Sequence, residues 1–276
     1  MAKILSKVFS AFIGAFLLFA AALRCIQLFF MTDASTGFIN GNRAGTIVLF
    51  FISCLAFILL IPVWLKNKVL KNPFYKSKSR LLFLSSVAAG IAMFYDFVFK
   101  CVNGYQYAAE VSAIRLNYFI PLCLSALSAL LCTLYFIMMG VSFKTDSYDF
   151  KNFKYYHIMP VFWNLFVLFS LLSDYNDGVY AEEKILHYIV LISGILFFIT
   201  LIGSMNSDYK KLKWLCFSGF VYGALCFVLS VPRIIAFLFG AELSGADFSA
   251  ATYLFISAFA AAVSLSMIKK NISKED

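Results

Sequence analysis

The sequence predicts an all-α, polytopic integral membrane protein, a helical bundle with eight transmembrane helices. The 276-residue chain is 62% hydrophobic and 13% charged, whereas soluble proteins carry about 25% charged residues. Long apolar runs recur along its whole length, and the gaps between them are too short for an extramembrane domain. Its positive charges collect in every second gap. Together these observations exclude an ordinary soluble globule.

Each apolar run has about the 17–25 residues that an α-helix needs to cross a bilayer. The predicted spans are residues 8–31, 44–65, 81–101, 118–140, 156–173, 185–204, 214–239 and 248–268. The first run follows Lys3 and Lys7, as a signal peptide would, with a cleavage region at Ala20-Ala21-Ala22. Its apolar character resumes after Arg24, which favours an uncleaved first span.

The distribution of Lys and Arg predicts the orientation. Seventeen of the 23 lie in the N-terminal segment, in the C-terminal tail and in the gaps 66–80, 141–155 and 205–213. The opposite gaps hold three cations and eight of the fourteen acidic residues. Because cytoplasmic loops carry an excess of Lys and Arg, we expect both termini in the cytoplasm. The short loops and the composition are typical of a bacterial plasma-membrane protein.

The eight spans divide into two groups of four, residues 1–140 and 141–276, within one compact membrane domain. The third span carries Ser85, Ala89, Ala92 and Asp96, and the seventh carries Gly219, Gly223, Cys226 and Ser230 at the same spacing. Four spans in each half predict parallel repeats. The alternative is that any two helices rich in small residues align equally well. The Gly219-x-x-x-Gly223 motif is expected to pack helices within the chain rather than to form a dimer.

Four charged residues lie inside spans, where each costs about 2.5–3.5 kcal/mol on insertion scales. They are Arg24, Asp96, Lys100 and Arg233, and the predicted orientation puts all four in the outer third of the membrane. Gln27, Asn164 and His187 add polar groups, and Pro232 removes a backbone hydrogen bond beside Arg233. The candidate ligand-binding residues are therefore Arg24, Gln27, Asp96, Lys100, Asn164, His187 and Arg233.

Two interpretations of these residues remain open. In the functional one, the three cations hold a small anionic solute or a lipid headgroup, and Asp96 either positions one of them or transfers a proton. In the structural one, Asp96 and Lys100 neutralise each other at i, i+4, Arg233 extends to the headgroups, and Arg24 either does the same or pairs with Asp96.

The sequence gives no support for a metal site, a cofactor, an enzyme or nucleic-acid binding. The seven cysteines lie in or next to spans without a C-x-x-C spacing, and the two histidines, His157 and His187, are predicted on opposite membrane faces. We therefore expect neither a metal site nor a cofactor. No nucleophile elbow, H-E-x-x-H helix or P-loop is present, so an enzyme is not expected. The basic residues border spans, which favours a lipid bilayer over nucleic acid as their partner.

The first functional hypothesis is a transporter or permease-like protein for a small solute, with anions among the candidates, and a polar site in the outer half of the bilayer. The alternative is a non-catalytic membrane sensor, or an assembly partner of another membrane protein. A polar face that continues to the cytoplasmic side would favour transport, and an apolar inner half below a one-sided pocket would favour binding. The inner halves of the even-numbered spans carry only Ser, Thr and Cys as polar residues, which argues against a continuous path.

Overall fold

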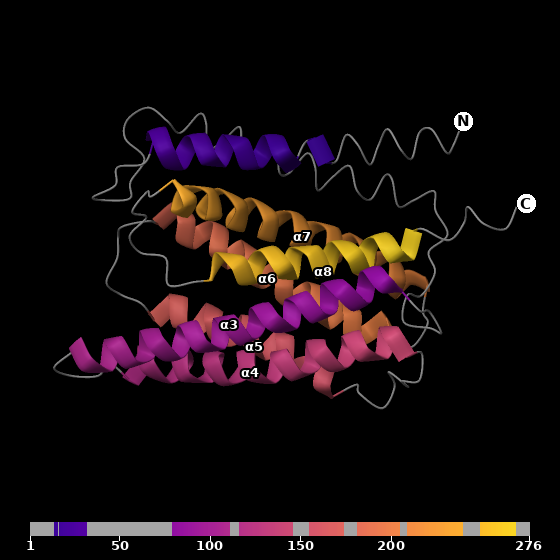
Figure 1. Cartoon of the computed structure of the whole chain (residues 1–276), viewed down its shortest axis with the longest axis horizontal. Coiled ribbons are helices and arrows are strands. Elements are labelled where there is room, and N and C mark those ends of the chain that lie inside the picture. The colour runs from indigo at the N-terminus through magenta and orange to yellow at the C-terminus, as the bar shows by residue number, and fades with distance from the viewer. Residues whose placement is uncertain are drawn as a thin grey trace, which may run out of the picture.

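The structure, a computed structural model, describes residues 14–15, 17–31, 79–110, 116–145, 155–173, 181–204, 209–239 and 249–268. Within these ranges all regular secondary structure is helical (Figure 1). The predicted second span, residues 44–65, lies outside the described residues, as do most of the loop cations.

Among the described residues, six helices are long and apolar enough to cross a membrane. They are α3 (Arg80–Glu110), α4 (Leu116–Thr145), α5 (Met159–Ser173, counted together with the helical turn before it), α6 (Ala181–Ser204), α7 (Tyr209–Leu238) and α8 (Ala250–Ile268). The short 3-10 helix η3 (Tyr156–Ile158) leads into α5. A shorter apolar helix, Leu17–Phe29, occupies part of the predicted first span, and the π-helical segment η1 (Gln27–Met31) overlaps its end. An all-helical bundle is thus confirmed, whereas the total of eight spans stays a prediction.

The six long helices close a ring. Each packs against the next along the chain, and α8 returns to pack against α3. Successive helices run in opposite directions, with α3 between α4 and α8 (Figure 1). Consequently α3, α5 and α7 end where α4, α6 and α8 begin; we call this the α3–α4 end. The charge distribution predicts that this end faces outside.

The helix Leu17–Phe29 lies beside α7 (Figure 1). Ala20 and Val228 form a small buried apolar cluster there, and the rings of Phe29 and Phe239 meet edge to face with centroids 6.2 Å apart. These contacts pack the helix Leu17–Phe29 against α7.

Glycines bring neighbouring helices close together. A Cβ atom on Gly219 would lie 2.3 Å from Ser264 Oγ, and one on Gly223 would lie 3.2 Å from the Ser257 carbonyl oxygen. Because Ser257 and Ser264 belong to α8, the small-residue motif packs α7 against α8 within the chain, as predicted. The division of the chain into two repeated halves stays a prediction.

Five aromatic side chains fill the interior where α4, α6, α7 and α8 meet. This aromatic layer consists of Phe136, Phe197, Phe198, Tyr222 and Phe259, all fully buried. Their ring centroids lie 4.9 to 6.4 Å apart, within the favourable range for aromatic pairs. The aromatic layer is thus a closely packed region between α4, α6, α7 and α8.

Candidate functional site

Two side chains of α3 form an ion pair in the interior of the six-helix bundle. Lys100 Nζ donates to Asp96 Oδ2 at 2.5 Å, and the two residues are only 5% and 1% exposed. Their i, i+4 spacing puts both side chains on one face of the helix. Removing two such charges from water costs several kcal/mol per ion unless further polar contacts compensate.

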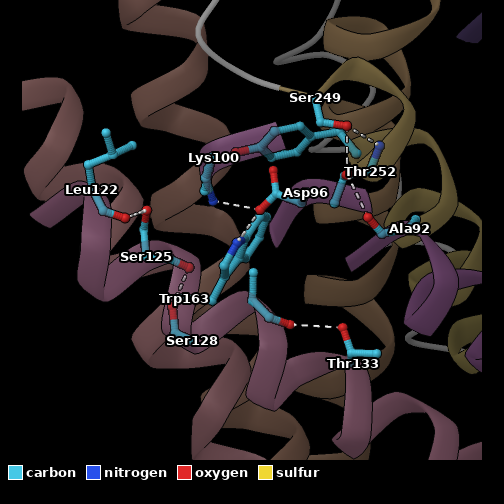
Figure 2. A network of polar contacts seen from close by, with 12 residues as sticks. Ala92, Asp96, Lys100, Leu122, Ser125, Ser128, Thr133, Trp163, Ser249 and Thr252 are labelled. Atoms are coloured by element: carbon cyan, nitrogen blue, oxygen red, sulfur yellow. Dashed lines mark hydrogen bonds and ion pairs between the residues drawn. The ribbon is translucent and has the colours of Figure 1, made fainter. Parts of the chain in front are cut away.

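Trp163 on α5 supplies those contacts. Its indole Nε1–H donates to the same oxygen, Asp96 Oδ2, at 2.9 Å. Lys100 Nζ also lies 5.1 Å from the centre of the Trp163 ring, close enough for a cation–π interaction. Figure 2 shows the three side chains converging from α3 and α5. The indole ring therefore ties the ion pair to a second helix.

The start of α8 is held close to this pair. Ser249 caps α8, because its Oγ accepts the Thr252 backbone N–H at 3.3 Å. The Thr252 hydroxyl donates to the Ala92 carbonyl oxygen of α3 at 3.0 Å (Figure 2). Because Ala92 lies one turn before Asp96, this bond fixes the beginning of α8 beside the ion pair.

His187 and Tyr253 extend the polar contacts to α6 and α8. His187 Nε2 lies 2.6 Å from Tyr253 Oη, and the ring of Tyr253 lies 5.7 Å from that of Trp163. Both residues are buried. We call Asp96, Lys100, Trp163, His187 and Tyr253 the polar cluster; it joins four of the six helices in the ring.

A pocket lies next to the polar cluster, toward the α3–α4 end. Lys100 and His187 form part of its wall. The beginning of α4 contributes Tyr118, Leu122 and Ser125, and the second half of α5 contributes Val167, Ser170 and Leu171. The space that water-sized atoms can occupy is about 30 Å³. None of these eight lining residues carries a carboxylate.

The hydroxyl groups of the pocket differ in their present contacts. Ser125 Oγ donates to the Leu122 carbonyl oxygen of its own helix at 2.8 Å. Ser170, in contrast, makes no hydrogen bond within the described part of the chain. Lys100 has a single hydrogen-bond acceptor there, Asp96 Oδ2, although an ammonium group has three N–H donors. Lys100 and Ser170 can therefore donate to a molecule in the pocket.

The aromatic layer separates the pocket from the opposite end of the bundle. Phe197 follows His187 by ten residues on α6, which corresponds to about 15 Å along the helix axis. Beyond the layer, the described residues form other polar contacts, including Tyr135 Oη with His157 Nδ1 at 2.7 Å and Thr200 with Ser218 at 2.8 Å. The pocket is thus one-sided in this conformation.

The structure brings together four of the seven predicted site residues. Lys100 and His187 line the pocket, and Asp96 holds Lys100. Arg233 on α7 lies close enough to act electrostatically on the His187 imidazole, as Lys100 does. These positions agree with a shared site, but the roles of the four residues as ligand-binding groups stay a prediction.

The other three predicted residues lie elsewhere. Arg24 and Gln27 hydrogen-bond to each other on the N-terminal helix, which packs against α7. Asn164 is fully buried, its Nδ2 donates to the Pro160 carbonyl oxygen at 2.7 Å, and it does not line the pocket. Its Oδ1 faces α6, because a Cβ atom on Gly194 would lie 2.5 Å from it.

Sequence reasoning missed Trp163, Tyr253, Tyr118 and Ser170. One signal was available for Trp163: the indole N–H of a tryptophan inside a span requires an acceptor, and Asp96 is the only acid inside the predicted spans. No comparable signal marks Tyr118 or Ser170, because many spans carry hydroxyl groups.

Within the described ranges, no group of three or more His, Cys, Asp or Glu side chains is placed to hold a metal ion. Comparison of the chain with models of known protein families, with curated proteins and with solved structures finds no match. The geometry of the pocket is therefore the basis for a functional proposal.

Proposed function

We propose that this chain is a membrane-embedded binding protein that takes a small polar solute into the pocket at the α3–α4 end. The observation that carries the proposal is a pocket with buried polar groups, Lys100 and His187, that ends above a packed aromatic layer. A site of this kind binds its ligand from one side and does not conduct it. The proposal includes no catalytic step.

Ligand binding would change the packing of the helices that meet at the polar cluster. Residues of α3, α5, α6 and α8 contact one another there, so a ligand held by Lys100 or His187 touches side chains that set the spacing of four helices. A ligand shifts a conformational equilibrium only through different affinities for the two states. We propose a sensor in a bacterial plasma membrane, with cytoplasmic termini, that passes this shift to another membrane protein.

A thermostability screen of the purified protein tests the proposal. A ligand at about one hundred times its dissociation constant stabilises the folded state by about 2.7 kcal/mol. We expect at least one small solute among acetate, formate, chloride, acetamide, formamide and glycerol to raise the unfolding temperature in a saturable manner.

Two leucine variants show whether the pocket is responsible. Ser170→Leu fills the pocket and is expected to lower the apparent affinity for the stabilising solute by about tenfold or more, while the ion pair stays in place. Ser266→Leu is the matched control, because Ser266 is also partly buried but lies near the other end of the bundle, at the end of α8. If no solute stabilises the protein, or if both variants respond like the parent, the proposal is wrong.

Transport of a small solute is the second candidate function. It is favoured by the polar contacts beyond the aromatic layer, such as that between Thr200 and Ser218, which would continue a path if the layer opened. Proteoliposomes that contain the protein separate the two functions. Uptake of radiolabelled acetate above that of protein-free liposomes would favour transport, whereas binding without uptake would favour sensing.

A further inference from the structure

We infer that the ligand of this pocket is a small monovalent anion, of the size of chloride, formate or acetate, held by the Lys100 ammonium group. The inference rests on the proposed function, because it assigns a chemical class to the same binding site. The donors in the wall, its charge and its size carry the argument.

The wall offers hydrogen-bond donors. Its polar members are the ammonium of Lys100, the imidazole of His187 and the hydroxyls of Tyr118, Ser125 and Ser170. Lys100 donates only to Asp96 in the described part of the chain, which leaves two N–H groups, and the Ser170 hydroxyl forms no bond there. A ligand that carries acceptors satisfies these groups, whereas a cation would meet an ammonium and no carboxylate in the wall.

Two cationic side chains lie near the part of the pocket wall that α6 contributes. Both Lys100 and Arg233 act electrostatically on the His187 imidazole. Asp96 lies behind Lys100 and bonds to Trp163, and it is not one of the residues that line the pocket. Charges act more strongly on one another in a low-dielectric interior than in water. Because the ammonium of the ion pair lines the pocket and its carboxylate does not, the pair favours an anion over a neutral molecule of the same shape.

The size of the pocket limits the ligand. About 30 Å³ is open to water-sized atoms, and one water molecule requires about 10–15 Å³ by this measure. The space therefore suits an ion with very few heavy atoms. Leu122, Val167 and Leu171 line the remaining wall and can contact a methyl group such as that of acetate.

Acetate and acetamide provide the decisive comparison, because they share shape and differ in charge. The unfolding temperature of the purified protein is followed at constant ionic strength in gluconate buffer, with acetate, formate, chloride, acetamide, formamide or sulfate added. We expect acetate, formate or chloride to stabilise the protein in a saturable manner, and acetamide, formamide and sulfate to have no such effect.

Two variants locate the anion. Ser170→Leu lowers the apparent affinity for the stabilising anion by about tenfold or more, and Ser266→Leu leaves it unchanged. Lys100→Met combined with Asp96→Asn removes the ammonium without leaving a buried charge unpaired, so the fold is retained, as circular dichroism will verify. This double variant is expected to lose the response to anions.

The outcomes distinguish this inference from the proposed function. If acetamide stabilises the protein as well as acetate through the same pocket, the binding function stands and the anion inference is wrong. A response to anions that persists in the folded double variant also overturns the inference, because Lys100 then does not hold the anion. If neither anions nor neutral solutes stabilise the protein, both the inference and the proposed function fail.

Discussion

Replacing Lys100 with methionine leaves the Asp96 carboxylate buried without its cation, and the cost follows from the geometry. At the observed 2.5 Å the attraction between the two charges is about 7 kcal/mol at an effective dielectric constant of 20. Part of this attraction offsets the desolvation of both ions. Breaking a buried pair by removing one partner costs about 3–5 kcal/mol in total. We expect Lys100→Met and Asp96→Asn each to lower the free energy of unfolding by this amount.

The double variant is the sharper test, because the two changes together remove both charges of this ion pair and leave neither partner unpaired. Asparagine keeps an oxygen that accepts the Trp163 N–H, and methionine fills the volume of the lysine stem. The double variant is therefore expected to lie within about 1 kcal/mol of the parent, which gives a coupling energy of at least about 5 kcal/mol.

Unfolding by SDS titration in mixed micelles, followed by circular dichroism, measures all three variants. Lys144→Met is a control, because Lys144 is exposed and its ammonium group lies 5.6 Å from the centre of the Phe83 ring, so its loss should cost at most about 1 kcal/mol. If the effects of the two single changes simply add in the double variant, the ion pair contributes nothing as a pair and the reasoning is refuted.

Two further predictions use the same titration. Gly219→Ala places a Cβ atom 2.3 Å from Ser264 Oγ and should destabilise the protein by about 1–3 kcal/mol, with partial recovery when Ser264→Ala is added. Gly14→Ala is the control, because a Cβ atom there meets nothing within 4 Å, and it should not lower the free energy of unfolding. Equal effects at the two glycines would contradict the close packing of α7 on α8. Tyr253→Phe removes the hydroxyl 2.6 Å from His187 and should cost about 1–3 kcal/mol. Tyr105→Phe is the control, because Tyr105 is 77% exposed, and its free energy of unfolding should stay within about 0.5 kcal/mol of the parent. An equally small effect of Tyr253→Phe would show that the bond to His187 is not stabilising.

Most of the fold could be predicted because a bilayer restricts what a chain can do. Backbone polar groups in hydrocarbon must be bonded internally, so a long apolar run in such a chain becomes a helix. The ends of the helices were less predictable. Helix α3 extends to Glu110, nine residues beyond the predicted span 81–101, since hydropathy marks the part of a helix in contact with lipid and not the point where its hydrogen bonds end.

The site could be predicted only where its contacts are local in sequence. The pairing of Asp96 with Lys100 follows from i, i+4 spacing, whereas Trp163 reaches Asp96 across 67 residues and Tyr253 reaches His187 across 66. In a soluble helix, apolar periodicity would have indicated which face of α5 is buried. In α5 both the buried stripe and the exposed face are apolar, so the single sequence does not distinguish a lipid-facing position from one that faces α3.

A thiol placed in the pocket tests most directly whether the pocket opens to one side only. Ser170→Cys is treated with a membrane-impermeant, anionic thiol reagent in right-side-out and in inside-out vesicles, and mass spectrometry assigns the modified residue, with the parent chain as the control. We predict modification from the outside alone, and slower modification when acetate is present. Equal modification from both sides would show a continuous path through the aromatic layer, and modification from the cytoplasmic side alone would contradict the predicted orientation.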